Sequence, residues 1–143
     1  MRRVRAGFLA AVFITVVALP AEPVRACNVC LEDKIAATYD WQVVANARRT
    51  GHQVVFVAIQ GTVAPRDEAL TRRLVRQLST VHGVDAGTVR ISLAPPAASF
   101  ACDPRHDPPA QVIAAMNRAL RPDGLMLALV RVGAPGGNAS AAR

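Results

Sequence analysis

The chain has 143 residues, of which 52% are hydrophobic and only 4% aromatic. This length suits a single domain whose core is built from alanine, valine, leucine and isoleucine. The formal charge of +7 would suggest a nucleic-acid partner, but residues 1–26 hold four arginines and one glutamate. The remainder has 13 basic and 9 acidic residues, a net charge of +4, so we expect no nucleic-acid binding.

Residues 1–26 have the three parts of a signal peptide. Three arginines precede an apolar segment from Ala6 to Leu19, and Val24-Arg25-Ala26 offers a cleavage site. The apolar run is shorter than the roughly 18 residues expected of a membrane-spanning helix. We therefore expect cleavage before Cys27 and a periplasmic or secreted protein. Lipidation of Cys27 is the alternative, and only this modification would attach the chain to a membrane.

Residues 27–51 are predicted to form an N-terminal helix that carries a Cys-x-x-Cys motif, Cys27-Asn28-Val29-Cys30, at its start. Acidic residues occupy its first turn, Arg48 and Arg49 its last, and Gly51 follows, as the helix dipole and capping preferences favour. Four apolar residues recur every four positions and predict one continuous helix over residues 30–50: Ile35, Tyr39, Val43 and Ala47.

The pattern then changes to short apolar segments separated by turn residues. In chain order it predicts a strand at 53–60, a helix from Pro65 to Gly83, strands at 89–93 and 98–102, a helix capped by Asp107, and a strand at 125–132. This order predicts an α+β fold, with a ferredoxin-like βαββαβ domain over residues 52–132 and an antiparallel sheet. Residues 133–143, rich in glycine, alanine and serine, are expected to form a disordered tail.

The first and last predicted strands, residues 53–60 and 125–132, are apolar on both faces. In the ferredoxin-like plan two helices cover one face of the sheet and leave the other open. We expect the N-terminal helix to cover that second face. Self-association through the same face, giving a homodimer, is the alternative.

Two stretches of this domain are similar to heavy-metal-associated domains. Gly83 to Ile91 resembles the Gly-Val start of that family's second strand, and Ala98 to Pro104 resembles its third strand, which ends in Asp-Pro. The resemblance covers residues 54–132 and implies a domain that carries copper, zinc or mercury. The family's metal-binding cysteines lie in the loop after the first strand, where this chain has Gly61 to Arg66 without cysteine. That site does not transfer to this sequence.

The predicted metal ligands are Cys27, Cys30, Cys102 and His106. Three sulfurs and one imidazole would form a tetrahedral zinc site, whereas two or three sulfurs without His106 would suit copper(I) or mercury(II). The two segments meet only if the N-terminal helix begins near the end of the third strand. The leading hypothesis is a small exported protein that binds or handles a metal ion and uses no organic cofactor.

Three other interpretations of the cysteines stay open. A disulfide from Cys102 to Cys27 or Cys30 would tie the helix to the sheet and contribute about 4 kcal/mol; the protein would then be a structural or interaction domain for an unknown periplasmic protein. Redox exchange at the Cys-x-x-Cys motif is the second interpretation, and it lacks the strand that precedes this motif in thioredoxin-like proteins. In the third, Cys102 is a buried free thiol.

Sequence motifs of the common enzyme classes are missing. The chain has no P-loop, Gly-x-Ser-x-Gly, His-Glu-x-x-His or dinucleotide fingerprint. His52 and His82 are interpreted as structural or solvated, and Asp103 as a turn residue before Pro104. We therefore predict that the protein is not an enzyme.

Overall fold

The computed structural model describes residues 28–133, and side chains from residue 31 onward. The predicted signal peptide, Cys27 and all but the first residue of the predicted tail lie outside this range. The elements are α1 (Asn28–Thr38), α2 (Trp41–Thr50), β1 (Gln53–Gln60), α3 (Glu68–Ser79), β2 (Arg90–Leu93), β3 (Pro96–Cys102), α4 (Pro109–Leu120), the short 3-10 helix η1 (Arg121–Asp123) and β4 (Met126–Gly133). The predicted α+β class is confirmed.

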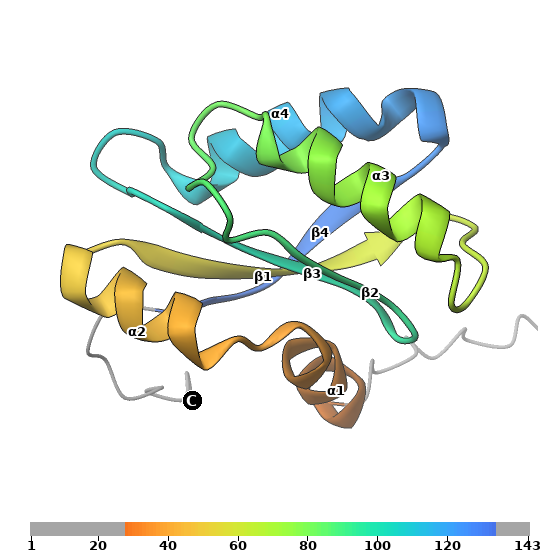
Figure 1. The fold of residues 1–143 in the computed structure, drawn as a ribbon, viewed down its shortest axis with the longest axis horizontal. Coiled ribbons are helices and arrows are strands. Elements are labelled where there is room, and N and C mark those ends of the chain that lie inside the picture. The colour runs from red at the N-terminus through yellow and green to blue at the C-terminus, as the bar shows by residue number, and fades with distance from the viewer. Residues whose placement is uncertain (1–27, 134–143) are drawn as a thin grey trace, which may run out of the picture.

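The four strands form one antiparallel sheet in the order β2-β3-β1-β4. Strand β3 lies between β1 and β2, so the two strands joined by α3 are not neighbours. Helices cover both faces: α3 and α4 lie on one, and α1 and α2 lie on the other (Figure 1). The expectation that the N-terminal segment covers the second face of the sheet is confirmed. None of the described helices has the length and apolar character needed to cross a membrane.

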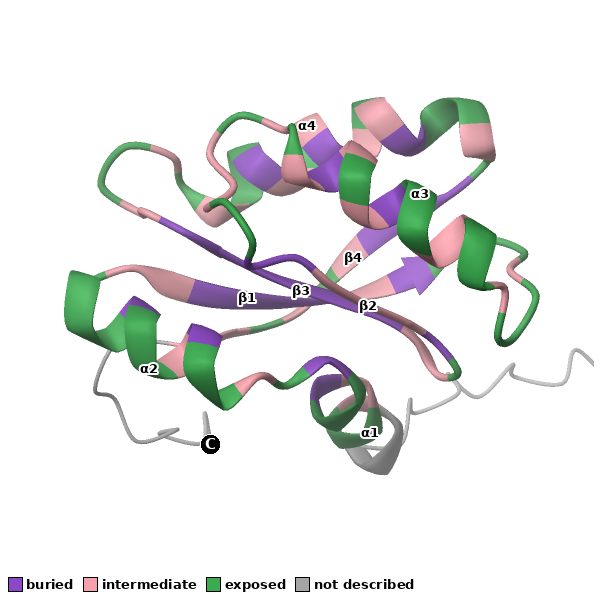
Figure 2. Ribbon diagram, viewed as in Figure 1, coloured by how far each residue is buried: buried purple, intermediate pink, exposed green. Residues whose placement is uncertain are grey.

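Successive side chains of β1 point to opposite faces of the sheet, so this strand contributes to two separate parts of the core. Val55, Val57 and Ile59 belong to the large cluster beneath α3 and α4, whereas Val54 and Phe56 pack with residues of α1 and α2. This strand is therefore buried on both faces, as its apolar sequence predicted. Figure 2 shows the buried residues concentrated in the central strands, with exposed residues on the outer faces of the helices.

The predicted single helix over residues 30–50 is wrong, because the chain forms two helices. Asp40 has extended backbone angles and caps α2, where its Oδ1 accepts hydrogen bonds from the backbone N–H groups of Gln42 and Val43 at 2.8 and 3.2 Å. Its Oδ2 also accepts from the Nε of Arg90 at 2.8 Å. Tyr39 is consequently 55% exposed instead of buried in a continuous stripe.

Two further helix boundaries differ from the predictions. Helix α3 begins at Glu68 instead of Pro65, because Asp67 caps it by accepting a hydrogen bond from the backbone N–H of Leu70, and it ends at Ser79. Asp107 does not cap α4. Pro108 occupies that position without a side-chain hydrogen bond, and the Asp107 carboxylate lies 3.2 Å from Nδ1 of His82.

Polar contacts hold α1 and its connection to α2 against the sheet. The buried Ser99 of β3 donates a hydrogen bond from Oγ to the carbonyl oxygen of Thr38 at 2.7 Å. Glu32 of α1 pairs with Arg131 of β4. Together with the Asp40–Arg90 pair, these contacts connect the N-terminal segment to three of the four strands.

Candidate functional site

Cys102 is fully buried at the end of β3. Its side chain belongs to the same cluster as Phe100 and Ala98, which faces α3 and α4. Burial raises the pKa of this thiol to about 11, and the negative charges of Asp85, Asp107 and Asp103 act in the same direction. In this environment Cys102 is a free, neutral thiol that packs as a small apolar group.

Helix α1, which contains Cys30, lies on the opposite side of the sheet from α3 and α4 (Figure 1). Cys30 lies in the first turn of α1, and Cys27 precedes that helix outside the described residues. Helix α1 packs on the sheet through Ile35, in the cluster that contains Val54 and Phe56. The structure therefore does not bring α1 and the Cys102 side chain to one face. A site or disulfide that combines Cys102 with Cys27 or Cys30 gains no support from this arrangement.

His106 lies on the exposed loop between β3 and α4. Its Nδ1 is 2.9 Å from Oδ2 of Asp103. The Asp103 carboxylate also accepts two hydrogen bonds from the Arg105 side chain, one at Oδ1 from Nε at 2.9 Å and one at Oδ2 from Nη2 at 3.0 Å. The hydrogen bonds from Arg105 hold the pKa of Asp103 well below its usual range. The backbone N–H of Arg105 bonds to the same carboxylate, which confirms Asp103 as a turn residue.

His52, directly before β1, lies at the same end of the sheet as Asp103. Its Nδ1 lies 2.6 Å from Oδ2 of Asp85, and its Nε2 lies 3.8 Å from Oδ2 of Asp103. Each carboxylate here already has a partner of opposite charge or a hydrogen-bond donor. Between residues 28 and 133, no group of three or more histidine, cysteine or acidic side chains is placed to hold a metal ion.

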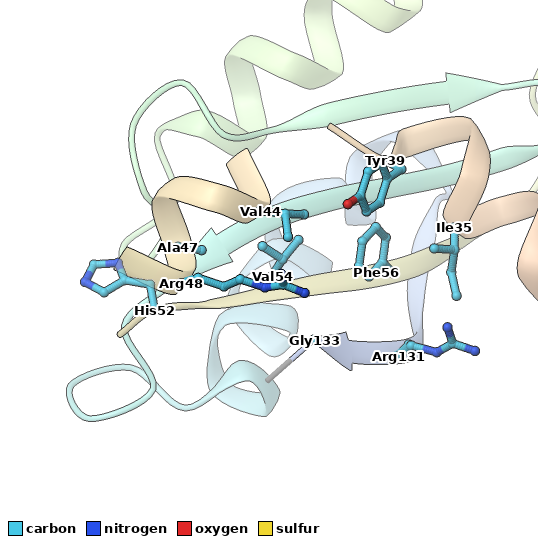
Figure 3. Close-up of a pocket in the computed structure, with 10 residues that line it drawn as sticks. All are labelled: Ile35, Tyr39, Val44, Ala47, Arg48, His52, Val54, Phe56, Arg131 and Gly133. Atoms are coloured by element: carbon cyan, nitrogen blue, oxygen red, sulfur yellow. The ribbon is translucent and has the colours of Figure 1, made fainter. Parts of the chain in front are cut away.

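A pocket that the sequence did not predict lies between α1, α2 and the sheet (Figure 3). Its volume is about 200 Å³. The helices supply one wall, and strands β1 and β4 supply the floor. The lining residues are Ile35, Tyr39, Val44, Ala47, Arg48, His52, Val54, Phe56, Arg131 and Gly133. Tyr39, in the connection between α1 and α2, borders the pocket beside Phe56 (Figure 3).

No protein-family profile, curated protein or solved structure matches this chain. Any function therefore has to be inferred from its own residues. Two features remain as candidates: the Cys27–Cys30 motif at the start of α1, and the pocket beside α1 and α2. The first was predicted from sequence, whereas the only sequence signal for the second is Asp40, a residue type that favours helix N-terminal caps.

Because the pKa of Cys102 is raised in the folded protein, we expect its free energy of unfolding to fall at high pH. Burial raises the pKa of Cys102 from 9.0 to about 11 in the folded protein. The folded state therefore holds the thiol proton more tightly than the unfolded state, so the contribution to stability is fully present below pH 9 and is lost as the pH rises toward 11. We therefore expect the free energy of unfolding, measured by urea denaturation in reductant, to fall by on the order of 2 kcal/mol by pH 10.5.

The control for this prediction is Cys102→Ala, which lacks the titrating thiol and keeps every other ionisable group. Its free energy of unfolding should fall less than that of the wild type over the same pH range. Parallel pH dependences in the two proteins would show that the thiol ionises equally in the folded and unfolded states.

Proposed function

We propose that this chain is an exported, non-catalytic protein that binds a soft metal ion, copper(I) or mercury(II), through Cys27 and Cys30. The described domain is the scaffold that presents these thiols. Cys102 and His106, the other two predicted ligands, are left out of the proposed site. The burial of Cys102 on the far face of the sheet and the pairing of His106 with Asp103 argue against their taking part.

The observation that carries this proposal is the position of Cys30 in the first described turn of α1. Cys27 comes three positions earlier in the sequence, and residues three positions apart lie on the same side of a helix. The partial positive charge at a helix N-terminus lowers the pKa of a nearby thiol, and the thiolate is the form that binds metal. Two thiolates are a suitable ligand set for copper(I).

We further propose that β1 to β4, with α3 and α4, form a ferredoxin-like domain. Supporting this are the βαββαβ order of the elements and the position of β3 between β1 and β2. In this respect the chain resembles heavy-metal-associated domains. In the proposed protein the thiols come from an added helix instead of the loop at Gly61 to Arg66.

A role as an interaction domain is the second candidate function. It is favoured by two exposed aromatic residues at the junction of α1 and α2, Tyr39 at 55% and Trp41 at 67% exposed. Aromatic side chains are enriched at protein interfaces. The partner would be another exported protein or a second copy of this chain, and no metal would be required.

The metal proposal is tested by native mass spectrometry of the exported full chain, kept in reductant and incubated with copper(I). We expect one bound ion per chain, and loss of that ion in the double variant Cys27→Ser, Cys30→Ser. The matched control is Cys102→Ala, which should retain the metal with a lower stability.

Retention of copper by the double variant would overturn the proposed ligands. Absence of copper from the fully reduced wild type would overturn metal binding itself. It would leave the interaction domain as the better candidate.

A further inference from the structure

We propose that the pocket between α1, α2 and the sheet binds a small aromatic carboxylate, with its ring on the apolar floor and its carboxylate at Arg48. Among the described side chains, none that lines this site is a cysteine. Three observations support the proposal: the size of the cavity, the composition of its floor, and the charge of its rim.

Size limits the ligand to a small molecule. A cavity of about 200 Å³ is below the range of about 300–1,000 Å³ typical of sites for larger ligands. A dry cavity of about 150 Å³ in another protein accepts benzene. One aromatic ring with a short substituent therefore matches the available space.

The floor and inner wall of the pocket are apolar. Val54 and Phe56 of β1 and Ala47 of α2 are buried in the smaller core cluster, and Ile35 of α1 joins them. Figure 3 shows Tyr39 beside Phe56 at the same side of the pocket, so that both rings border the space. Aromatic rings pair favourably with a third ring in stacked or edge-to-face arrangements.

The charged groups of the lining are all basic. Arg48, Arg131 and His52 line the pocket, and none of the acidic residues within the described range does. Arg131 is paired with Glu32, and His52 bonds to Asp85 and points away from the pocket in Figure 3. Arg48 has no carboxylate partner among the described residues and extends across the pocket. An anionic substituent would complete this arrangement, since a guanidinium binds a carboxylate with two parallel hydrogen bonds.

The test is an NMR titration of the full exported chain with phenylacetate and with its neutral amide, phenylacetamide. Phenylacetate should shift the amide signals of residues around the pocket, and phenylacetamide should bind about fivefold more weakly, as expected for one partly exposed ion pair. Arg48→Gln should remove this difference. Arg49→Gln, one position further along α2 and hydrogen-bonded to Asn46 instead, should preserve it.

A second variant, Val44→Phe, tests the location of the site. It adds volume to the pocket wall and should weaken the binding of both ligands. If Val44→Phe does not fold, Arg48→Gln still tests the proposal, because it changes only an exposed side chain. Equal affinity for the acid and the amide would overturn the anion preference. Absence of shifts around the pocket would overturn the site, as would concentration-dependent shifts without ligand, which would indicate that a second copy of the chain covers it.

Discussion

Phe100→Ala is expected to lower the free energy of unfolding by about 4 kcal/mol. Phe100 is 1% exposed and lies in the large cluster between the sheet and helices α3 and α4. Outside residues 1–26 the chain has only one other phenylalanine, Phe56, and that residue belongs to the opposite cluster. Small side chains surround Phe100 in β3, so the cavity left by the substitution has few long neighbours in that strand to fill it.

Urea denaturation of the wild type and variant measures this loss. The matched control is Trp41→Ala, which removes a larger aromatic side chain that is 67% exposed and should change stability by less than about 0.5 kcal/mol. If Phe100→Ala does not fold, Phe100→Leu keeps most of the volume and should cost roughly 1.5 kcal/mol. Equal losses at positions 100 and 41 would contradict the placement of Phe100 in the core.

The strands were the most predictable part of the fold. Residues 53–60 are apolar at nearly every position, and this pattern requires a strand covered on both faces. The structure provides that cover with α3 and α4 on one face and α1 and α2 on the other. Alternation likewise placed Cys102 on the side of Phe100, and both residues belong to the same cluster.

Helix boundaries were less predictable because distant residues decide them. The stripe that begins at Ile35 continues through Val43 and Ala47, so periodicity alone favours one helix. Asp40 interrupts it by capping α2, and its second carboxylate oxygen bonds to Arg90, which is 50 residues further along the chain. The pocket is lined by residues of α1, α2 and the connection between them, so it was missed together with this boundary.

The predicted metal ligands illustrate a different difficulty. The sequence predicted that Cys102 shares a face with Phe100 and that the N-terminal helix covers the face left open by the other two helices, but not which of these faces carries Phe100. The ligand set combined Cys102 with Cys27 and Cys30, because spacing and residue type alone carry no information about sheet faces. The structure supplies that information through the two separate clusters.

Gly61→Ala is expected to lower the free energy of unfolding by roughly 3 kcal/mol. Gly61 follows β1 with φ of 117°, which L side chains rarely adopt. A Cβ at this position would lie 2.7 Å from the carbonyl oxygen of Gly124 and 2.8 Å from Cδ2 of Leu125. The backbone between η1 and β4 would have to move away from the loop after β1, so strain and overpacking both contribute.

Gly87→Ala is the control at a glycine with open space around it. Gly87 also has a positive φ, 71°, but a Cβ there would meet nothing within 4 Å. It should cost only about 1 kcal/mol of backbone strain. Urea denaturation of both variants compares this open position with Gly61, where a φ of 117° and close packing act together. Equal losses at positions 61 and 87 would contradict the close approach of Gly61 to Gly124 and Leu125.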